Sequence, residues 1–182
     1  PLYHHIVEII NCIDKGSEIA NQLLGFAKVD EYYTSSIDVN RLVRKAMENL
    51  DLSGKRIVLD VDLDIKPLVV EGDPEKINQV LKSIVHNAIL AMPRGGKLSV
   101  VTESAAILNG TAEAYGLETG FFVKITVTDS GIGMEKEVLE NIFTPFYSAD
   151  HKRYPEKKGL GLTFAREIVQ NHQGVIDVWS SP

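Results

Sequence analysis

The sequence predicts an α/β fold in which helices cover one face of a mixed β-sheet, with one long helix ahead of it. The sequence alternates between two kinds of stretch. Some have the period of 2 and the β-branched residues of strands, and others have helical periodicity. Some of the expected strands follow one another without a helix between them. The first stretch differs, because its apolar residues recur at steps of four and three without an internal proline. The 182 residues suffice for one domain with a sizeable core and one appended element.

Composition excludes several classes of protein. With 44% hydrophobic and 24% charged residues the chain is no disordered tail, and its formal net charge of -6 argues against a nucleic-acid surface. The single cysteine, Cys12, excludes an internal disulfide and a multi-cysteine metal site. No apolar run approaches the ~18 residues of a membrane span and no signal peptide opens the chain. We therefore expect a cytoplasmic location without direct membrane contact, although a longer parent protein can still be membrane-anchored.

The long helix is expected over residues 2–29. Such a helix cannot bury its apolar seam alone, so a partner helix or a second chain is implied. Residues 31–37 are mostly polar and predict a linker. The seam consists of Ile6, Ile10, Ile13, Ser17, Ala20, Leu24 and Ala27.

The next elements follow from a capping residue and two short apolar stretches. Asp38 or Asn40 can cap a helix over residues 41–50. Residues 56–62 alternate apolar and polar side chains like a half-exposed strand, and residues 68–70 form a second short strand.

A longer helix begins after Asp73, which is an N-cap residue followed by a proline and an acid, and runs to about Met92. Ser83 and Asn87 lie four residues apart on the border of its apolar face. This polar pair is either a compromise of packing or the place where the helix presents polar groups to a cavity.

Residues 97–102 and 121–129 are expected to be neighbouring strands, joined by a surface excursion over residues 103–120. At the end of the second strand the pattern Asp-x-Gly-x-Gly places the carboxylate of Asp129 beside Gly131 and Gly133. Glycines let another group approach the backbone closely, so the pattern indicates either a ligand site or an ordinary turn.

A short helix over residues 135–141 and a proline-interrupted apolar run over residues 142–147 come next. Residues 148–158 lack apolar periodicity and hold a basic cluster, which is typical of a solvated loop and also suits a polyanion such as triphosphate. Residues 159–163 then open a helix that runs to about His172, and glycines at a helix start expose N–H groups to phosphate. Residues 175–179 are expected to form the last strand.

Four segments in this order resemble the N, G1, F and G2 boxes of sensor histidine kinases, in the Bergerat-type ATPase superfamily. They are residues 84–88, 128–134, 143–147 and 159–162. Residues 23–28 also resemble the end of the second helix of these kinases' dimerisation hairpin. The resemblance implies that residues 1–30 are that second helix, with the first helix missing, and that residues 38–182 are the catalytic ATP-binding domain with its final strand truncated.

The fold implied by the resemblance is an α/β (α+β) sandwich, with a mixed, mostly antiparallel sheet and three main helices on one face. Asp129 would accept a hydrogen bond from the adenine amino group, and Gly133 would allow close approach to the ring. Asn87 would ligate Mg²⁺ that bridges the phosphates, and Thr163 would lie near the adenine side. The implied ATP-binding residues are Asn87, Asp129, Gly131, Gly133, Lys152, Lys158, Gly159, Leu160, Gly161, Leu162 and Thr163.

The implied activity is transfer of the ATP γ-phosphoryl group to a histidine, for relay to an aspartate of a response regulator, by a parent protein that dimerises through its N-terminal helix. His4 and His5 do not match the acceptor box, so we assign no catalytic residue and expect no autophosphorylation by this chain alone.

Two departures keep alternatives open. Ser83 stands where many kinases have a first asparagine, and Lys157-Lys158 precede the last glycine segment. Hydrolytic relatives carry a glutamate one turn before the metal asparagine, and a serine cannot act as that base at neutral pH. The alternatives are a hydrolytic ATPase of the same superfamily and a nucleotide-free interaction module with the same fold.

Overall fold

The computed structural model describes residues 33–148 and 159–182. The chain divides into two units between Tyr33 and Thr34, and the second unit, Thr34–Pro182, holds all of the described helices and strands. The expected long helix over residues 2–29, the start of the expected linker, and the basic residues Lys152 and Lys158 lie outside the described residues.

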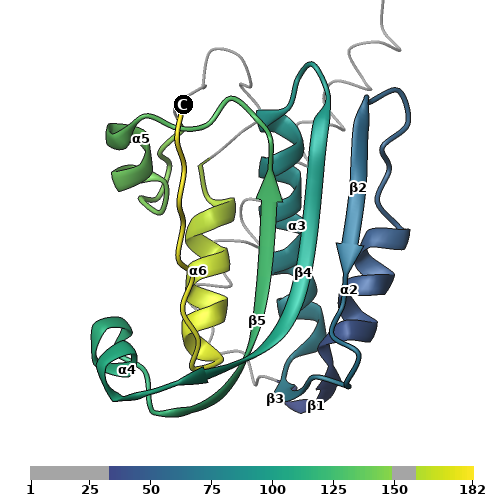
Figure 1. Ribbon diagram of the computed structural model, residues 1–182. Helices are drawn as coiled ribbons and strands as arrows, with labels where there is room; N and C mark the ends of the chain where they lie inside the picture. Colours follow the sequence, from purple (N-terminus) through teal and green to yellow (C-terminus); the bar gives the residue numbers. More distant parts are fainter. Residues whose placement is uncertain (1–32, 149–158) are drawn as a thin grey trace, which may run out of the picture. The chain divides into compact units, whose positions relative to one another are not determined.

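A three-stranded mixed sheet forms the centre of the second unit (Figure 1). Its order is β2 (Ile57–Asp62), β4 (Gly96–Ile107), β5 (Gly120–Asp129), with β2 parallel to β4 and β4 antiparallel to β5. β1 (Ser35–Asp38) and β3 (Val69–Gly72) pair antiparallel in a separate two-stranded sheet. The predicted mixed sheet is therefore confirmed, and β5 is an edge strand of the described sheet.

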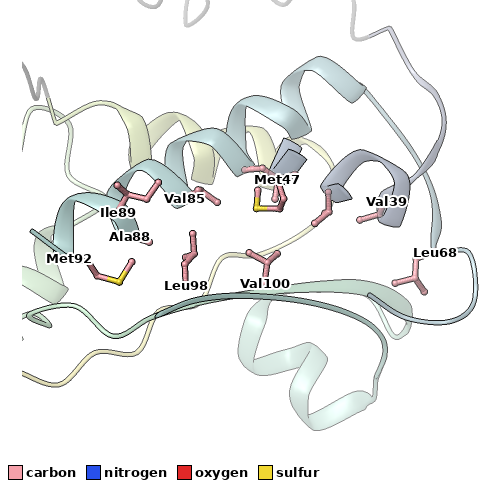
Figure 2. Packing of buried hydrophobic residues seen from close by; sticks show 11 residues of the cluster. Val39, Met47, Leu68, Val85, Ala88, Ile89, Met92, Leu98 and Val100 are labelled. Carbon is pink, nitrogen blue, oxygen red and sulfur yellow. The ribbon is translucent and has the colours of Figure 1, made fainter. Parts of the chain in front are cut away.

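Three helices cover one side of this sheet, as predicted: α2 (Val39–Glu48), α3 (Pro74–Ala91) and α6 (Gly161–Asn171). Figure 2 shows side chains of α3 directed toward Leu98 and Val100 of β4. Burying each large aliphatic side chain contributes about 1.5–3 kcal/mol. The most completely buried large side chains are Leu81, Leu98, Val43, Val85 and Val100.

The start of each of the first two helices is fixed by an aspartate. Asp38 Oδ1 accepts a hydrogen bond from Arg41 N at 3.3 Å, and Asp73 Oδ1 accepts from Glu75 N at 2.9 Å and Lys76 N at 3.1 Å. The helix predicted after Asp73 is confirmed. Asp38 rather than Asn40 is the cap of α2, because Asn40 is 7% exposed and donates instead to the carbonyl oxygens of residues 64 and 66.

Two loop predictions need correction. Residues 35–37 of the expected linker belong to β1, where Ile37 is buried. The expected excursion over residues 103–120 is shorter than predicted, because β4 continues to Ile107 and α4 (Asn109–Tyr115) fills most of the connection. Both strand segments form through pairing with residues distant in sequence, which local patterns do not reveal.

The expected last strand over residues 175–179 is also wrong as a paired strand. This segment alternates between half-buried and exposed residues like a strand, but it joins neither sheet. Ile176 packs against Val80, Ala165 and Ile168. The alternation of half-buried and exposed residues therefore comes from packing against α3 and α6 instead of from strand pairing. We call residues 175–182 the C-terminal segment.

Candidate functional site

One face of α3 carries Ser83, Asn87 and Ala91, each four residues after the last. In a helix, residues four apart lie one above the other at a rise of about 6 Å, so this stripe spans about 12 Å. The described residues place one glycine segment against each end of the stripe, with Asn87 midway between them.

The turn after β5 lies against the Ala91 end. Ile132 N donates to Ala91 O at 3.1 Å, and a Cβ added to Gly131 would lie 2.7 Å from both Ala91 O and Ala91 Cβ. Because a real Cβ does not tolerate such a distance, only glycine lets the turn lie this close to α3. Ser130 adds a second attachment, since it donates through N to Lys97 O at 3.1 Å and accepts from Lys97 N through Oγ at 2.8 Å.

Asp129 stands at the start of this turn with an exposed side chain. Its Oδ1 accepts a hydrogen bond from Gly131 N at 2.8 Å, which fixes the direction of the carboxylate. No hydrogen bond to Oδ2 is recorded within the described part of the chain. One carboxylate oxygen is thus held by the turn and the other is available to a donor on a ligand.

Position 133 needs a glycine for two reasons, its backbone conformation and a close neighbour. Its φ of +66° lies in the left-handed region, and an added Cβ would lie 2.0 Å from Ser181 O. Met134 N donates to Ser180 Oγ at 2.9 Å. The group that closely approaches this glycine in the structure is therefore the C-terminal segment, and approach of an adenine ring stays a prediction.

The start of α6 lies against the Ser83 end of the stripe. A Cβ added to Gly161 would lie 2.7 Å from Ser83 Oγ, and the first residue before the helix, Leu160, is buried. No side chain caps α6, so the N–H groups of its first turn, from Gly161, Leu162 and Thr163, are left for an anion.

Thr163 is engaged with the chain itself. It is 7% exposed, and its Oγ1 donates to Phe143 O at 3.2 Å, which ties α6 to the apolar run after α5 (Lys136–Asn141). A position beside adenine stays a prediction for this residue.

The same apolar run, residues 142–147, contacts Gly159 closely. Phe146 N donates to Gly159 O at 3.1 Å, and a Cβ added to Gly159, whose φ is +65°, would lie 2.4 Å from Tyr147 O. Phe146 itself has a φ of +63°, an uncommon conformation for a bulky residue. The run after α5 therefore anchors the glycine that precedes α6.

The donor set suits Mg²⁺ held jointly with a substrate. Asn87 is half-buried, and within the described residues its side chain has no recorded hydrogen bond. The described residues include no group of three or more His, Cys, Asp or Glu side chains that could hold a metal ion. Mg²⁺ commonly takes few protein ligands together with substrate phosphates and waters, so a single amide oxygen fits it.

Sequence reasoning missed three residues that shape the site, which are Ala91, Ser130 and Ser180. Ala91 acts through its carbonyl oxygen and the serines through hydroxyls, across sequence separations of 33 residues for Ser130 and 46 for Ser180. A signal existed only for Ala91, which is one helical turn beyond Asn87.

Among the described residues, no helix is both long and apolar enough to span a lipid bilayer.

Comparison with known proteins identifies the family of the chain. The family model described as "Histidine kinase-, DNA gyrase B-, and HSP90-like ATPase" matches residues 72–182. The sensor histidine kinase ZraS of Escherichia coli K12 is 30% identical over 169 residues, which cover 92% of this chain and 32% of that protein. The sensory histidine kinase/phosphatase NtrB of Salmonella typhimurium is 32% identical over 178 residues, which cover 96% of this chain and 48% of that protein.

Among solved structures, the catalytic domain of histidine kinase ThkA is similar, with a TM-score of 0.60 and 26% sequence identity over 76% of this chain and 81% of that chain. The chain spans less than half the length of ZraS and of NtrB. The residues matched by the family model begin at the end of β3 and include α3, the turn after β5 and the start of α6. By that match and this arrangement, the chain belongs to the histidine kinase-, DNA gyrase B- and HSP90-like ATPase family.

Proposed function

We propose that this chain is the ATP-binding catalytic part of a sensor histidine kinase, which transfers the γ-phosphoryl group of ATP to a histidine outside the chain. The observation that carries the proposal is the position of Asn87 on α3, between a turn that lies against Ala91 and a helix start that lies against Ser83. In this proposal α3 sets the distances between the turn that binds the base, the metal ligand Asn87 and the helix start that binds the phosphates.

At the base end, Asp129 supplies the selectivity. Its free carboxylate oxygen would accept a hydrogen bond from the adenine amino group, and the Gly131 N–H bond at 2.8 Å keeps the carboxylate in place. A hydrogen bond to a charged acceptor is stronger than one between neutral groups.

At the phosphate end, the uncapped first turn of α6 would hold phosphate oxygens through backbone N–H groups. Asn87 would hold Mg²⁺, which neutralises charge on the phosphates when it is bound. Lys152 and Lys158 are proposed to add positive charge from the basic cluster that precedes α6 in the sequence.

Transfer to a protein acceptor is favoured over hydrolysis because the position one turn before Asn87 is Ser83. A water-activating base is needed there for hydrolysis, and a serine hydroxyl does not ionise near neutral pH. Phosphoryl transfer to a positioned side chain needs alignment and charge neutralisation instead.

The proposed partners follow from the relatives. ThkA has also been solved in complex with the response regulator protein TrrA, and that kinase shares the fold of this chain with a TM-score of 0.64. We propose a response regulator as the phosphoryl acceptor downstream, and dimerisation of the parent through residues 1–30. Use of ATP favours a cytoplasmic location for the chain, and the parent protein is proposed to carry any membrane anchor.

Nucleotide titration tests the proposal. A non-hydrolysable ATP analogue should bind saturably in the presence of Mg²⁺ by isothermal titration calorimetry. Asp129→Asn should weaken binding by about tenfold or more, because it replaces a charged acceptor. Asp62→Asn is the matched control, since Asp62 is likewise an exposed aspartate at the end of a strand, and it should leave the affinity unchanged.

Two outcomes would contradict the proposal: no saturable binding by the folded chain, or unchanged affinity in Asp129→Asn. Steady release of phosphate from ATP by the chain alone, abolished by Asn87→Ala, would favour the hydrolytic alternative.

A further inference from the structure

The turn after β5 is attached to the rest of the domain at three successive points. Ser130 bonds to Lys97 at the start of β4, and Ile132 N bonds to Ala91 O at the end of α3. The third attachment is Met134 N, which donates to Ser180 Oγ at 2.9 Å. Among the bonds of the described residues, this last one alone holds the far end of the turn, and it depends on one side-chain hydroxyl.

Ser180 can serve as an anchor because the segment that carries it is itself attached elsewhere. Ile176 packs with Val80, Ala165 and Ile168 between α3 and α6. Tyr115 of α4 donates a hydrogen bond from its hydroxyl to Asp177 Oδ2 at 2.5 Å. These contacts hold the C-terminal segment independently of the turn.

The approach of the C-terminal segment to the turn is close along the backbone as well. A Cβ on Gly133 would lie 2.0 Å from Ser181 O and 2.9 Å from Pro182 Cα. Ser181 contributes its carbonyl to this contact and Ser180 its hydroxyl, so two adjacent serines meet the turn through different atoms.

We propose that Ser180 is a positioning residue for base selection, because it fixes the end of the turn whose beginning is Asp129. The inference rests on the proposed function, in which Asp129 reads the base. Adenine presents an amino donor where guanine presents a carbonyl acceptor, and a carboxylate held in one direction accepts from the first and repels the second. Release of the turn's far end leaves Gly131, whose N–H directs the carboxylate, on a less firmly held turn and weakens this discrimination.

The anchor itself is tested without any nucleotide, by amide hydrogen exchange of Met134 measured by NMR. In Ser180→Ala the Met134 amide loses its acceptor and should exchange about fivefold faster or more. Ser181→Ala is the matched control, since it removes a neighbouring hydroxyl but leaves the backbone carbonyl that meets Gly133, and its Met134 amide should exchange as in wild type. Equal exchange in the wild type and Ser180→Ala would overturn the anchor.

Base selection is tested by titrating non-hydrolysable ATP and GTP analogues into the wild type and three variants. Ser180→Ala should bind the ATP analogue about fivefold more weakly, with a smaller change for the GTP analogue, so that the preference for adenine falls. Ser180→Thr keeps the hydroxyl and should restore the preference, and Ser181→Ala should retain it.

The outcomes separate the two proposals. If the wild type binds the ATP analogue and Ser180→Ala keeps the full preference for adenine, the role of Ser180 is overturned and the proposed function stands. If the wild type binds neither nucleotide, both the proposed function and the role of Ser180 in base selection are overturned. Faster exchange of the Met134 amide in Ser180→Ala would still establish the anchor.

Discussion

Gly161, at the start of α6, has one close neighbour among the residues that the structure describes. Of their atoms, a Cβ at this position would meet two within 4 Å, Ser83 Oγ at 2.7 Å and Ser83 Cβ at 3.9 Å. The first distance forces a displacement and the second is an ordinary contact. The small residue at position 83 and the missing side chain at position 161 are therefore matched in size, and together they set how closely the start of α6 approaches α3.

This match predicts coupling between two substitutions. Gly161→Ala gains up to about 1 kcal/mol of helix propensity but must displace the Ser83 hydroxyl, so in the wild-type background the gain is offset. In a Ser83→Ala background only the gain remains. The double variant should thus show a coupling free energy of about 1 kcal/mol in urea unfolding.

Gly110 supplies the control for this coupling. It also lies near a helix start, in α4, but no atom of the described residues lies within 4 Å of the Cβ position. Gly110→Ala should change the free energy of unfolding equally in both backgrounds. Strictly additive effects of Gly161→Ala and Ser83→Ala would show that the contact does not govern this position.

At the same scale, the sequence predicted the parts of the site that act within a few residues. The bond from Gly131 N to Asp129 is local, and the pattern Asp-x-Gly-x-Gly had placed the Asp129 carboxylate beside this glycine. Ser130 and Ser180 were not predictable, because a serine hydroxyl carries no sign of a partner 33 or 46 positions away. The approach of Ser181 to Gly133 was not predictable for the same reason, since Ser181 comes from the other end of the domain.

At the scale of elements, α4 and the C-terminal segment are joined by Tyr115 and Asp177. The hydrogen bond to the Asp177 carboxylate, together with its negative charge, raises the pKa of Tyr115 above its ordinary value near 10. Both side chains are exposed, so the effect on stability is small. Because Tyr115 holds its proton more tightly in the folded state, the hydrogen bond stabilises the fold at low pH. This contribution is complete below the ordinary tyrosine pKa and is lost as the pH rises through the raised value.

A pH titration of the Tyr115 ring resonances by NMR checks this element contact. Tyr115 should ionise above the ordinary tyrosine range in the wild type and within that range in Asp177→Asn. The asparagine Oδ1 can still accept from Val178 N, as the aspartate Oδ1 does, so the variant removes charge without removing that bond. Identical titration of Tyr115 in both proteins would rule out the contact in solution.

Elements with a clear local signal in the sequence were predicted, and elements without one were not. α3 has an aspartate cap, a proline in its first turn and a regular apolar face, and the sequence shows all three. β1 exists because it pairs with β3, and α4 is a seven-residue helix without a side-chain cap. The C-terminal segment has the alternation of a strand, and only the structure reveals that it joins neither sheet.

At the scale of the domain, α3 organises both the core and the site. Its buried side chains at positions 81, 85, 88 and 89 join those of α2 and β4 in the main core. Its opposite border carries Ser83, Asn87 and Ala91, which meet α6 and the turn after β5. The fold class was predictable because it follows from the order of periodic segments, while the meeting of two glycine segments on one helix face rests on three-dimensional packing.

The central claim is that one nucleotide lies along this face of α3, with its base at the Ala91 end and its phosphates at the Ser83 end. The most direct test is to add a non-hydrolysable ATP analogue with Mg²⁺ and map amide chemical-shift changes on the isotope-labelled chain. The largest changes should fall on residues 129–134, on Asn87 and on residues 160–163, with residues 109–115 of α4 unaffected. Saturable changes confined to α4 and the C-terminal segment, or no changes at all, would contradict the claim.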